Sequence, residues 1–409
     1  MRFSFLHAAD LHLGSPFQGL SLRDPRLAER FGAASREAFE ALIDRALEER
    51  VAFAIFAGDI FDGEWRDASA ALFFNRQIAR LTREGVKVYL LKGNHDAESV
   101  VTKSLSLPDA AHEFPARKAR TFLIEELRVA LHGRSFADRA ESGNFAVDYP
   151  EPKPGWLNIG VLHSSLDGRP GHANYAPCAL TDLRAKNYDY WALGHVHAHE
   201  IVCENPFVVY PGNLQGRSIR ECGEKGAVLV DVEDGAVKGL RRLIVDRARF
   251  AEILIDASGL ETPAELLREI SARAREEIEG AAGRFLAARL RVQGASALHP
   301  QLAADPSGWR EQVEAALHHA GDTIELEKFL VETRAPKQKD GAAKGDSELD
   351  FAALLDEVLA DQAFAEEARA AISVIEAKMP PKSELPRENF EALLGEARDL
   401  ALARAERSA

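Results

Sequence analysis

Five short apolar runs in the first half of the chain each end in side chains that commonly bind metal ions. The runs are the candidate strands Phe3–Ala8, Phe53–Ala57, Val86–Leu91, Trp156–Leu162 and Tyr190–Leu193. The polar residues that follow them are, in order, Asp10 and His12 in DxH, Asp59 in GD, Asn94, His95 and Asp96 in GNHD, then His163, and finally His195 and His197 in GHxH. Because sites in open α/β sheets form at the carboxyl ends of strands, we expect these distant clusters to meet.

Segments with helical periodicity separate these apolar runs. Apolar residues recur at helical spacing from Leu27 to Ala46, and residues 68–84 are predicted to form a second helix that ends at Gly85. Farther along, residues 201–210 and 226–245 contain Asn-Pro and Asp-Gly turn signals and are predicted to form β-hairpins. Alternating strands and helices predict an α/β domain over residues 1–245.

The rest of the chain divides into three further segments. Residues 248–333 alternate strand and helix patterns and are predicted to form a small separate α/β domain. Residues 334–347 hold no large apolar side chain and are predicted to be a flexible linker. Residues 348–409 are rich in Ala, Glu and Leu, with apolar residues at helical spacing, and are predicted to form a helical region.

Composition narrows the class of protein. The chain has 409 residues, 46% of them apolar and 28% charged, which is typical of a soluble protein of several domains. Three cysteines without CxxC spacing favour a reducing compartment, and no apolar run approaches the ~20 residues that a membrane span needs. With no signal-peptide pattern at the N-terminus, we expect a cytoplasmic protein without a membrane partner.

The net charge of −14 at first disfavours a nucleic-acid partner, because phosphate attracts basic surfaces. Residues 347–409, however, hold 14 acidic and 7 basic side chains, so half of the excess lies in the helical region. The composition therefore does not exclude a DNA substrate. It does predict that this chain alone binds DNA weakly, since no strongly basic stripe is visible.

The residue types at the strand ends indicate a particular kind of metal site. They are imidazoles, carboxylates and one amide, without cysteine, a set that suits Mn, Fe or Zn in a hydrolytic centre of two metals. Two-residue spacing within DxH and GHxH is expected to place both members of each pair on one side of an extended strand. Gly58, Gly93 and Gly194 adjoin these residues and allow a close backbone approach. Any one of these polar residues alone would be explained as well by a helix cap or a buried polar group.

In this order, the motifs over residues 1–245 resemble those of the calcineurin-like metallophosphoesterase superfamily. The opening HAADLHL and the segment YPGNLQGRSIRECGEKG at residues 210–226 are similar to the SbcD and YhaO type of bacterial DNA-repair exonucleases. This resemblance implies a sandwich of two β-sheets flanked by helices, with a small α/β capping domain. It also implies a helical C-terminal tail that binds an SMC-like ATPase.

The resemblance further implies two divalent ions, with Mn²⁺ expected and Fe or Zn as alternatives. One ion would be bound by Asp10, His12, Asp59 and His197, and the other by Asp59, Asn94, His163 and His195. Asp59 would then bridge two ions that activate water for attack on phosphorus, so that no Ser or Cys nucleophile is required. His95 would protonate the leaving oxygen, and Asp96 would orient the His95 imidazole. Arg217 and Arg220 are expected to contact the phosphate backbone.

These features predict a metal-dependent nuclease that hydrolyses phosphodiester bonds at DNA ends, in DNA repair, together with an ATPase. A phosphodiesterase or phosphatase for a small molecule is the alternative, because its chemistry is the same. The residues beyond the first domain favour the nuclease, since a small substrate does not need them. A scaffold that had lost its metals would lack ligands, and none is missing here. Whether the chain forms a homodimer stays open.

Overall fold

The computed structural model describes residues 1–17, 20, 24–62, 68–98, 107–168, 175–336 and 351–376, together with 390, 393–395, 397–398 and 400–401. The chain separates into two compact units, Met1–Ala251 with Ala281–Ala287, and Glu252–Gly280 with Ala288–Ala409. The return of residues 281–287 to the first unit is not visible in the sequence pattern. Residues 337–347 of the predicted linker lie outside the described residues, as does most of 387–407.

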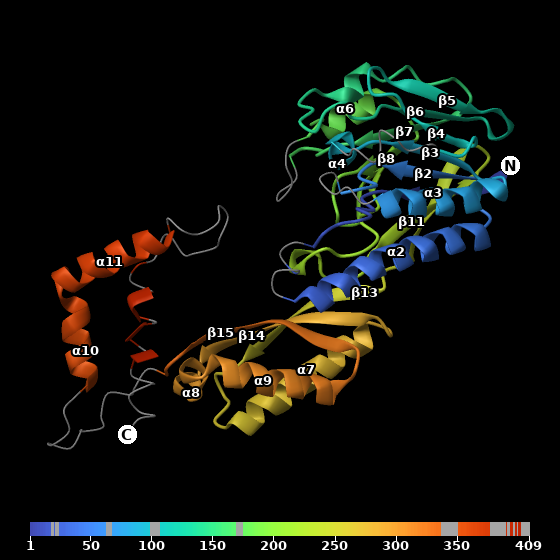
Figure 1. Ribbon diagram of the computed structural model, residues 1–409. Helices are drawn as coiled ribbons and strands as arrows, with labels where there is room; N and C mark the ends of the chain where they lie inside the picture. Colours follow the sequence, from blue (N-terminus) through green and yellow to red (C-terminus); the bar gives the residue numbers. More distant parts are fainter. Residues whose placement is uncertain are drawn as a thin grey trace. The chain divides into compact units, whose positions relative to one another are not determined.

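Two sheets form the first unit, and each has six strands among the residues that the structure describes (Figure 1). The first sheet has the order β12-β11-β1-β2-β3-β4. Its strands are β1 (Arg2–Ala8), β2 (Phe53–Ala57), β3 (Lys87–Leu91), β4 (Ala111–Glu113), β11 (Gly226–Glu233) and β12 (Ala236–Ile244). Strands β1 to β4 run parallel, and the predicted hairpin β11–β12 pairs antiparallel with β1. The carboxyl ends of β1, β2 and β3 therefore lie at one edge.

The second sheet has the order β5-β6-β7-β8-β10-β9. Its strands are β5 (Arg120–Ile124), β6 (Val129–Gly133), β7 (Leu157–His163), β8 (Tyr190–Gly194), β9 (Glu200–Glu204) and β10 (Phe207–Tyr210). Strands β6, β7, β8 and β10 are mutually parallel, and β9–β10 is the second predicted hairpin. Strands β7 and β8 are neighbours, so the motifs that follow them are also brought together.

The two sheets pack face to face, and helices cover their outer faces. Along β2, Phe53 and Ile55 enter the core between the sheets, where they meet Ile159 and Tyr190 of the second sheet. Phe56 points the other way, into the core that the first sheet shares with its helices. Because both faces of β2 are buried, its sequence is continuously apolar rather than alternating. The predicted sandwich of two sheets flanked by helices is confirmed.

Four helices accompany these sheets in the described part of the first unit. They are α2 (Pro25–Glu48), α3 (Ala68–Arg83), α4 (Asn94–Glu98) and α6 (Leu180–Ala185). Helix α2 begins after Asp24, whose carboxylate accepts hydrogen bonds from the N–H groups of Arg26 and Leu27. Helices α2 and α3 bury Phe39 and Phe74 against the first sheet.

The second unit has the predicted order of strands and helices, with one additional short helix. Its elements are β13 (Ala248–Asp256), α7 (Pro263–Gly280), β14 (Phe285–Ala295), α8 (His299–Ala304), α9 (Pro306–Ala320) and β15 (Ile324–Arg334). The strands form a sheet of order β13-β14-β15, and α7 packs against α9. Helix α8 was not expected from the sequence, because only six residues separate Leu298 from Asp305 and they give no helical period.

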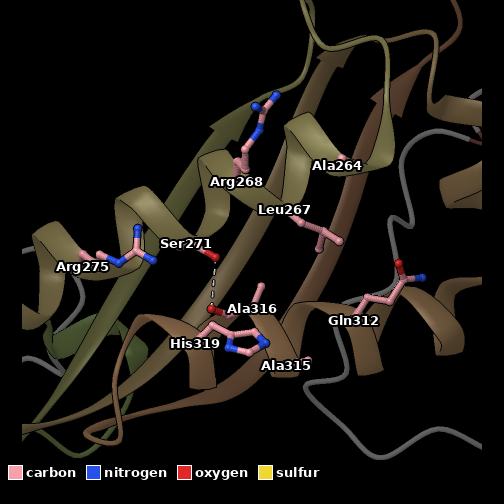
Figure 2. A pocket seen from close by; sticks show the side chains of 9 residues that line it. All are labelled: Ala264, Leu267, Arg268, Ser271, Arg275, Gln312, Ala315, Ala316 and His319. Atoms are coloured by element: carbon pink, nitrogen blue, oxygen red, sulfur yellow. Dashed lines mark hydrogen bonds between the residues drawn. The ribbon is translucent and has the colours of Figure 1, made fainter.

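A groove of about 560 Å³ lies between α7 and α9 (Figure 2). It is lined by Ala264, Leu267, Arg268, Ser271, Arg275, Gln312, Ala315, Ala316 and His319. The Ser271 hydroxyl donates a hydrogen bond to the Ala316 carbonyl at 3.2 Å and joins the two helices at the groove floor. None of the lining residues belongs to the sequence motifs, so the groove is not the site that the motifs predict.

The tail contains α10 (Phe351–Ala360) and α11 (Gln362–Glu376) where the structure describes it. Leu354, Val358, Phe364 and Val374 of these helices are exposed. Within the described segments, we find no helix with the length and apolar character required to cross a membrane.

Candidate metal centre

The loops that follow β1 and β2 run side by side and carry the first three motif residues. The Asp10 N–H donates to the Gly58 carbonyl, and the His12 N–H donates to the Asp59 carbonyl, both at 3.0 Å. The parallel pairing of β1 with β2 thus continues past the strand ends. It fixes the backbone that presents all three side chains to one edge of the sheet.

Four motif residues have left-handed backbone conformations that are rare outside glycine. Their φ angles are +53° at Asp10, +44° at His12, +51° at Asp59 and +103° at His195. Such conformations cost about 1–3 kcal/mol each and persist where the surrounding structure imposes them, commonly at functional sites. The paired residues therefore converge through strained turns beyond the strands. Strand alternation, which we expected to place both members of each pair on one side, is not what orients them.

Asp10, His12 and His197 form the first group of candidate ligands, and their ligand atoms lie within 4.8 Å of one another. The Nε2 atoms of His12 and His197 are 3.1 Å apart, and His197 Nε2 is 4.0 Å from Asp10 Oδ1. The backbone N–H of His195 donates one bifurcated hydrogen bond to both oxygens of the Asp10 carboxylate, at 3.0 and 3.1 Å. This bond ties the DxH loop to the GHxH loop of the second sheet.

Asp59, His163 and His195 form the second group, also within 4.8 Å, and Asn94 adjoins it. The His163 Nε2 atom lies 3.1 Å from Asn94 Oδ1 and 3.5 Å from Asp59 Oδ2. The same Asp59 oxygen is 3.9 Å from His12 Nε2 of the first group. Asp59 therefore stands between the two groups, where the resemblance places a bridging ligand.

The donor chemistry of both groups fits cations. His163 Nδ1 donates to the Ala57 carbonyl at 2.9 Å, so its Nε2 presents a lone pair to the oxygens of Asp59 and Asn94. His197 Nδ1 is engaged by Glu221, which leaves its Nε2 lone pair facing His12. Acceptors that face one another without a donor repel unless a proton or a metal ion lies between them. The residues present therefore fit two metal ions.

The pKa shifts of the buried carboxylates and imidazoles are consistent with the same excess of acceptors. Burial raises the pKa of Asp10 to about 6, although His163 and His197 act in the opposite direction. Burial alone would lower the pKa of His163, but the Asp59 carboxylate raises it to about 9. Without a metal, the second group thus takes up a proton at neutral pH. Metal ions that bind here must displace that proton.

Asp62, rather than Asp96, is the carboxylate partner of His95. The His95 Nδ1 atom lies 2.8 Å from Asp62 Oδ1, and Arg217 Nη2 lies 3.4 Å from Asp62 Oδ2. Burial would lower the pKa of His95, but its hydrogen bond to Asp62 raises that pKa above its usual value. The His95 side chain is 27% exposed, whereas His163 is fully buried, so His95 is accessible to a substrate.

The predicted role of Asp96 as the residue that orients His95 is therefore wrong. Asp96 accepts hydrogen bonds from the backbone N–H groups of Ile60, Phe61 and Gly93 at 2.9–3.1 Å. It joins the loop after β2 to the loop after β3, and its burial raises its pKa to about 7. Consecutive residues of a helix point in different directions, so His95 and Asp96 of α4 do not face each other.

Glycines allow the loops to approach closely at the three expected positions. Gly93 lies against the Asp59 side chain, and Gly194 lies against the Ala57 carbonyl and the His163 ring, so that a Cβ at either glycine would overlap these atoms. Gly58 is the third such position: a Cβ there would lie 2.5 Å from His163 Nδ1, and its φ of +93° is in addition unfavourable for other residues.

The two predicted phosphate-binding arginines have different positions. Arg217 is half-buried beside Asp62, within the site. Arg220 is exposed in the 3₁₀ turn Ile219–Glu221.

Two functional residues were missed by sequence reasoning, namely Asp62 and Glu221. Asp62 follows Asp59 by three residues in GDIFD, a spacing that could have drawn attention to it. Glu221 gives no such signal, because its neighbours Arg217 and Arg220 suggested a solvated surface pair. Its side chain is in fact only 18% exposed and contacts His197 at 2.7 Å.

Comparisons with known proteins agree with this geometry. Residues 3–199 match the calcineurin-like phosphoesterase family, and residues 250–334 match the middle domain of metallophosphoesterase YhaO. The chain is 38% identical over 238 residues to the uncharacterized metallophosphoesterase YhaO of Bacillus subtilis (strain 168), an alignment that covers 57% of this chain and 58% of that protein. It is 25% identical over 292 residues to the DNA double-strand break repair protein Mre11 of Methanopyrus kandleri, which covers 64% and 61% respectively.

The alignments span about three fifths of the length of these two relatives. The first unit supplies every ligand-bearing motif, and residues 250–334 match the YhaO-type domain. Residues 3–199 thus form a calcineurin-like metallophosphoesterase domain, and residues 250–334 match a middle domain of the YhaO type.

Proposed function

We propose that this chain is a two-metal-dependent nuclease that hydrolyses phosphodiester bonds at DNA ends in DNA repair. One observation carries the proposal: Asp59 lies between the two ligand groups, 3.5 Å from His163 and 3.9 Å from His12, and the His95–Asp62 pair lies beside them. Paired metal sites of this kind serve in-line displacement at phosphorus. The expected metal is Mn²⁺.

The residues around the metal centre have separate roles in hydrolysis. When bound, the two ions supply an activated water and stabilise charge on the phosphoryl oxygens. Asp62 accepts the Nδ1–H of His95 and so leaves Nε2 to carry the proton that the departing sugar oxygen requires. Arg217, held 3.4 Å from Asp62, presents its guanidinium to the scissile phosphate.

DNA as the substrate and an ATPase as the partner rest on further support. The Mre11 relative is named as a double-strand break repair protein, and the similarity extends past the catalytic domain. The tail helices expose Leu354 and Val358 one helical turn apart, together with Phe364 and Val374. An exposed apolar stripe of this kind can bind in a hydrophobic groove of a helical partner, and we propose that this partner is an SMC-like ATPase. A small-molecule phosphodiesterase remains the alternative because the site chemistry is identical.

Purified protein with Mn²⁺ should degrade linear duplex DNA, and it should act more slowly on covalently closed circles, which have no ends. Chelation should abolish the cleavage, and added Mn²⁺ should restore it. Gel electrophoresis of end-labelled DNA measures both, with hydrolysis of bis(p-nitrophenyl) phosphate followed in parallel. Rapid hydrolysis of that small ester without cleavage of DNA, both alone and with the ATPase, would favour the alternative function.

Replacing Asp62 by Asn should lower kcat by roughly 10–100-fold with little change in KM, because His95 loses the charge that holds it. Since Asp62 raises the pKa of His95, its removal lowers that pKa. The acid form of His95 is then lost at lower pH, so the alkaline limb of the pH–rate profile moves down. Steady-state rates between pH 6 and 10 check this, and an unmoved alkaline limb would mean that His95 does not act through Asp62.

A further inference from the structure

Glu221 is a buried carboxylate next to the first ligand group, and the motifs do not include it. It accepts three hydrogen bonds, from His197 Nδ1 at 2.7 Å, from Asn213 Nδ2 at 2.8 Å and from the Arg217 N–H at 2.7 Å. Its neighbour Glu224 is 51% exposed and has only ion pairs of 3.7 Å, to Arg242 and Arg249. Glu221 is therefore a largely buried carboxylate with three hydrogen-bond donors, not a solvated surface charge.

The bond from His197 decides which nitrogen of that ring faces the candidate ligands. An ionised carboxylate accepts only, so the hydrogen must be on His197 Nδ1. The Nε2 lone pair is then directed toward His12 Nε2 at 3.1 Å and Asp10 Oδ1 at 4.0 Å. A carboxylate in this position fixes the tautomer and the ring orientation of a metal-binding histidine and increases its basicity.

The second oxygen of Glu221 connects the same carboxylate to the substrate side of the site. It holds the Arg217 backbone, and the Arg217 side chain reaches Asp62, which in turn holds His95. One carboxylate thus links a metal-ligand candidate to the residue that we assign to proton transfer. In the described part of the second ligand group, His163 instead donates its Nδ1–H to the neutral carbonyl of Ala57.

We propose that Glu221 is a positioning residue that sets the metal affinity of the Asp10–His12–His197 group, through the Nδ1–H of His197, without setting that of the other group. The proposal rests on the metal centre of the proposed function. The two metal-binding groups then differ in how a histidine ligand is held. His197 of the first group donates its Nδ1–H to the charged Glu221 carboxylate, and His163 of the second donates to the neutral Ala57 carbonyl.

Calorimetric titration of the metal-free protein with Mn²⁺ tests the proposal without any substrate. Wild type should bind two ions per chain, and Glu221→Gln should bind one of them about 10–100-fold more weakly while the other is unchanged. Cobalt provides a second readout, since the visible absorption of the bound Co²⁺ should change for one ion only. Glu224→Gln, three residues away and exposed, should match wild type in both measurements.

Glu221→Asp keeps the charge but shortens the side chain, and it should lower the Mn²⁺ affinity of the same single group. This second variant allows the proposal to be tested even if Glu221→Gln folds poorly. Thermal unfolding of the metal-free variants shows whether each is folded. Wild-type affinity at both sites in folded Glu221→Gln would overturn the proposal, as would equal weakening of both sites. Failure of wild type to bind two ions would instead overturn the metal centre, and with it the proposed function.

Discussion

His95→Ala should lower kcat by about 10²–10⁴-fold, because a general acid contributes a rate factor of that size. The variant should still bind two metal ions. The His95 imidazole lies 2.8 Å from Asp62 and is partly exposed. It is outside the Asp10–His12–His197 and Asp59–His163–His195 groups, although its ligand atom is within 4.8 Å of those of His12 and Asp62. Its loss therefore removes a proton donor and leaves the candidate ligands in place.

The loss should depend on the leaving group. A substrate with an acidic phenol as its leaving group needs little proton donation, so bis(p-nitrophenyl) phosphate should be affected much less than DNA. Steady-state kinetics on both substrates, with metal content measured by atomic absorption, separates the two roles. His318→Ala, at an exposed position of α9, is the matched control and should behave as wild type. Equal losses on both substrates together with lost metal would show that His95 is a ligand.

Asp59→Asn should have the largest effect of all, exceeding that of His95→Ala and reducing the bound metal to one ion or none. Asp59 Oδ2 is near ligands of both groups, 3.5 Å from His163 and 3.9 Å from His12. Its other oxygen accepts the His95 N–H at 3.0 Å. An amide at this position keeps the shape but loses the charge that two cations would share.

Stabilisation by metal gives a readout for Asp59→Asn that is independent of activity. A ligand at 100 times its Kd stabilises the folded state by about 2.7 kcal/mol, so Mn²⁺ should raise the Tm of wild type by several degrees. The Tm of Asp59→Asn should change little with Mn²⁺. Asp44→Asn, an exposed carboxylate of α2, should keep the full metal response. A variant at Asp59 that keeps the wild-type response would contradict the bridging role.

Much of this protein is determined by patterns that are local in the sequence. The apolar runs that become β1, β2, β3, β7 and β8 were predicted to within a residue or two, because each is short, buried on both faces and bounded by polar turns. The seven candidate ligands follow directly from those strand ends. Parallel strands bring their carboxyl ends to one edge of a sheet, so order along the chain was sufficient to group the ligands within each sheet. The ligands of the two sheets meet because the sheets pack face to face, which the sequence pattern does not encode.

The hydrogen-bond partner of each site histidine, by contrast, was decided only by the tertiary structure. Asp96 is next to His95 in sequence, yet Asp62 from another loop is its partner, since successive residues of α4 point apart. Glu221 reaches His197 only because its turn folds back on the GHxH loop. The strained φ angles at Asp10, His12, Asp59 and His195 likewise follow from pairing between distant loops. The places of the ligands along the chain follow from where the strands end, whereas their orientations and hydrogen-bond partners depend on contacts between segments that no local pattern encodes.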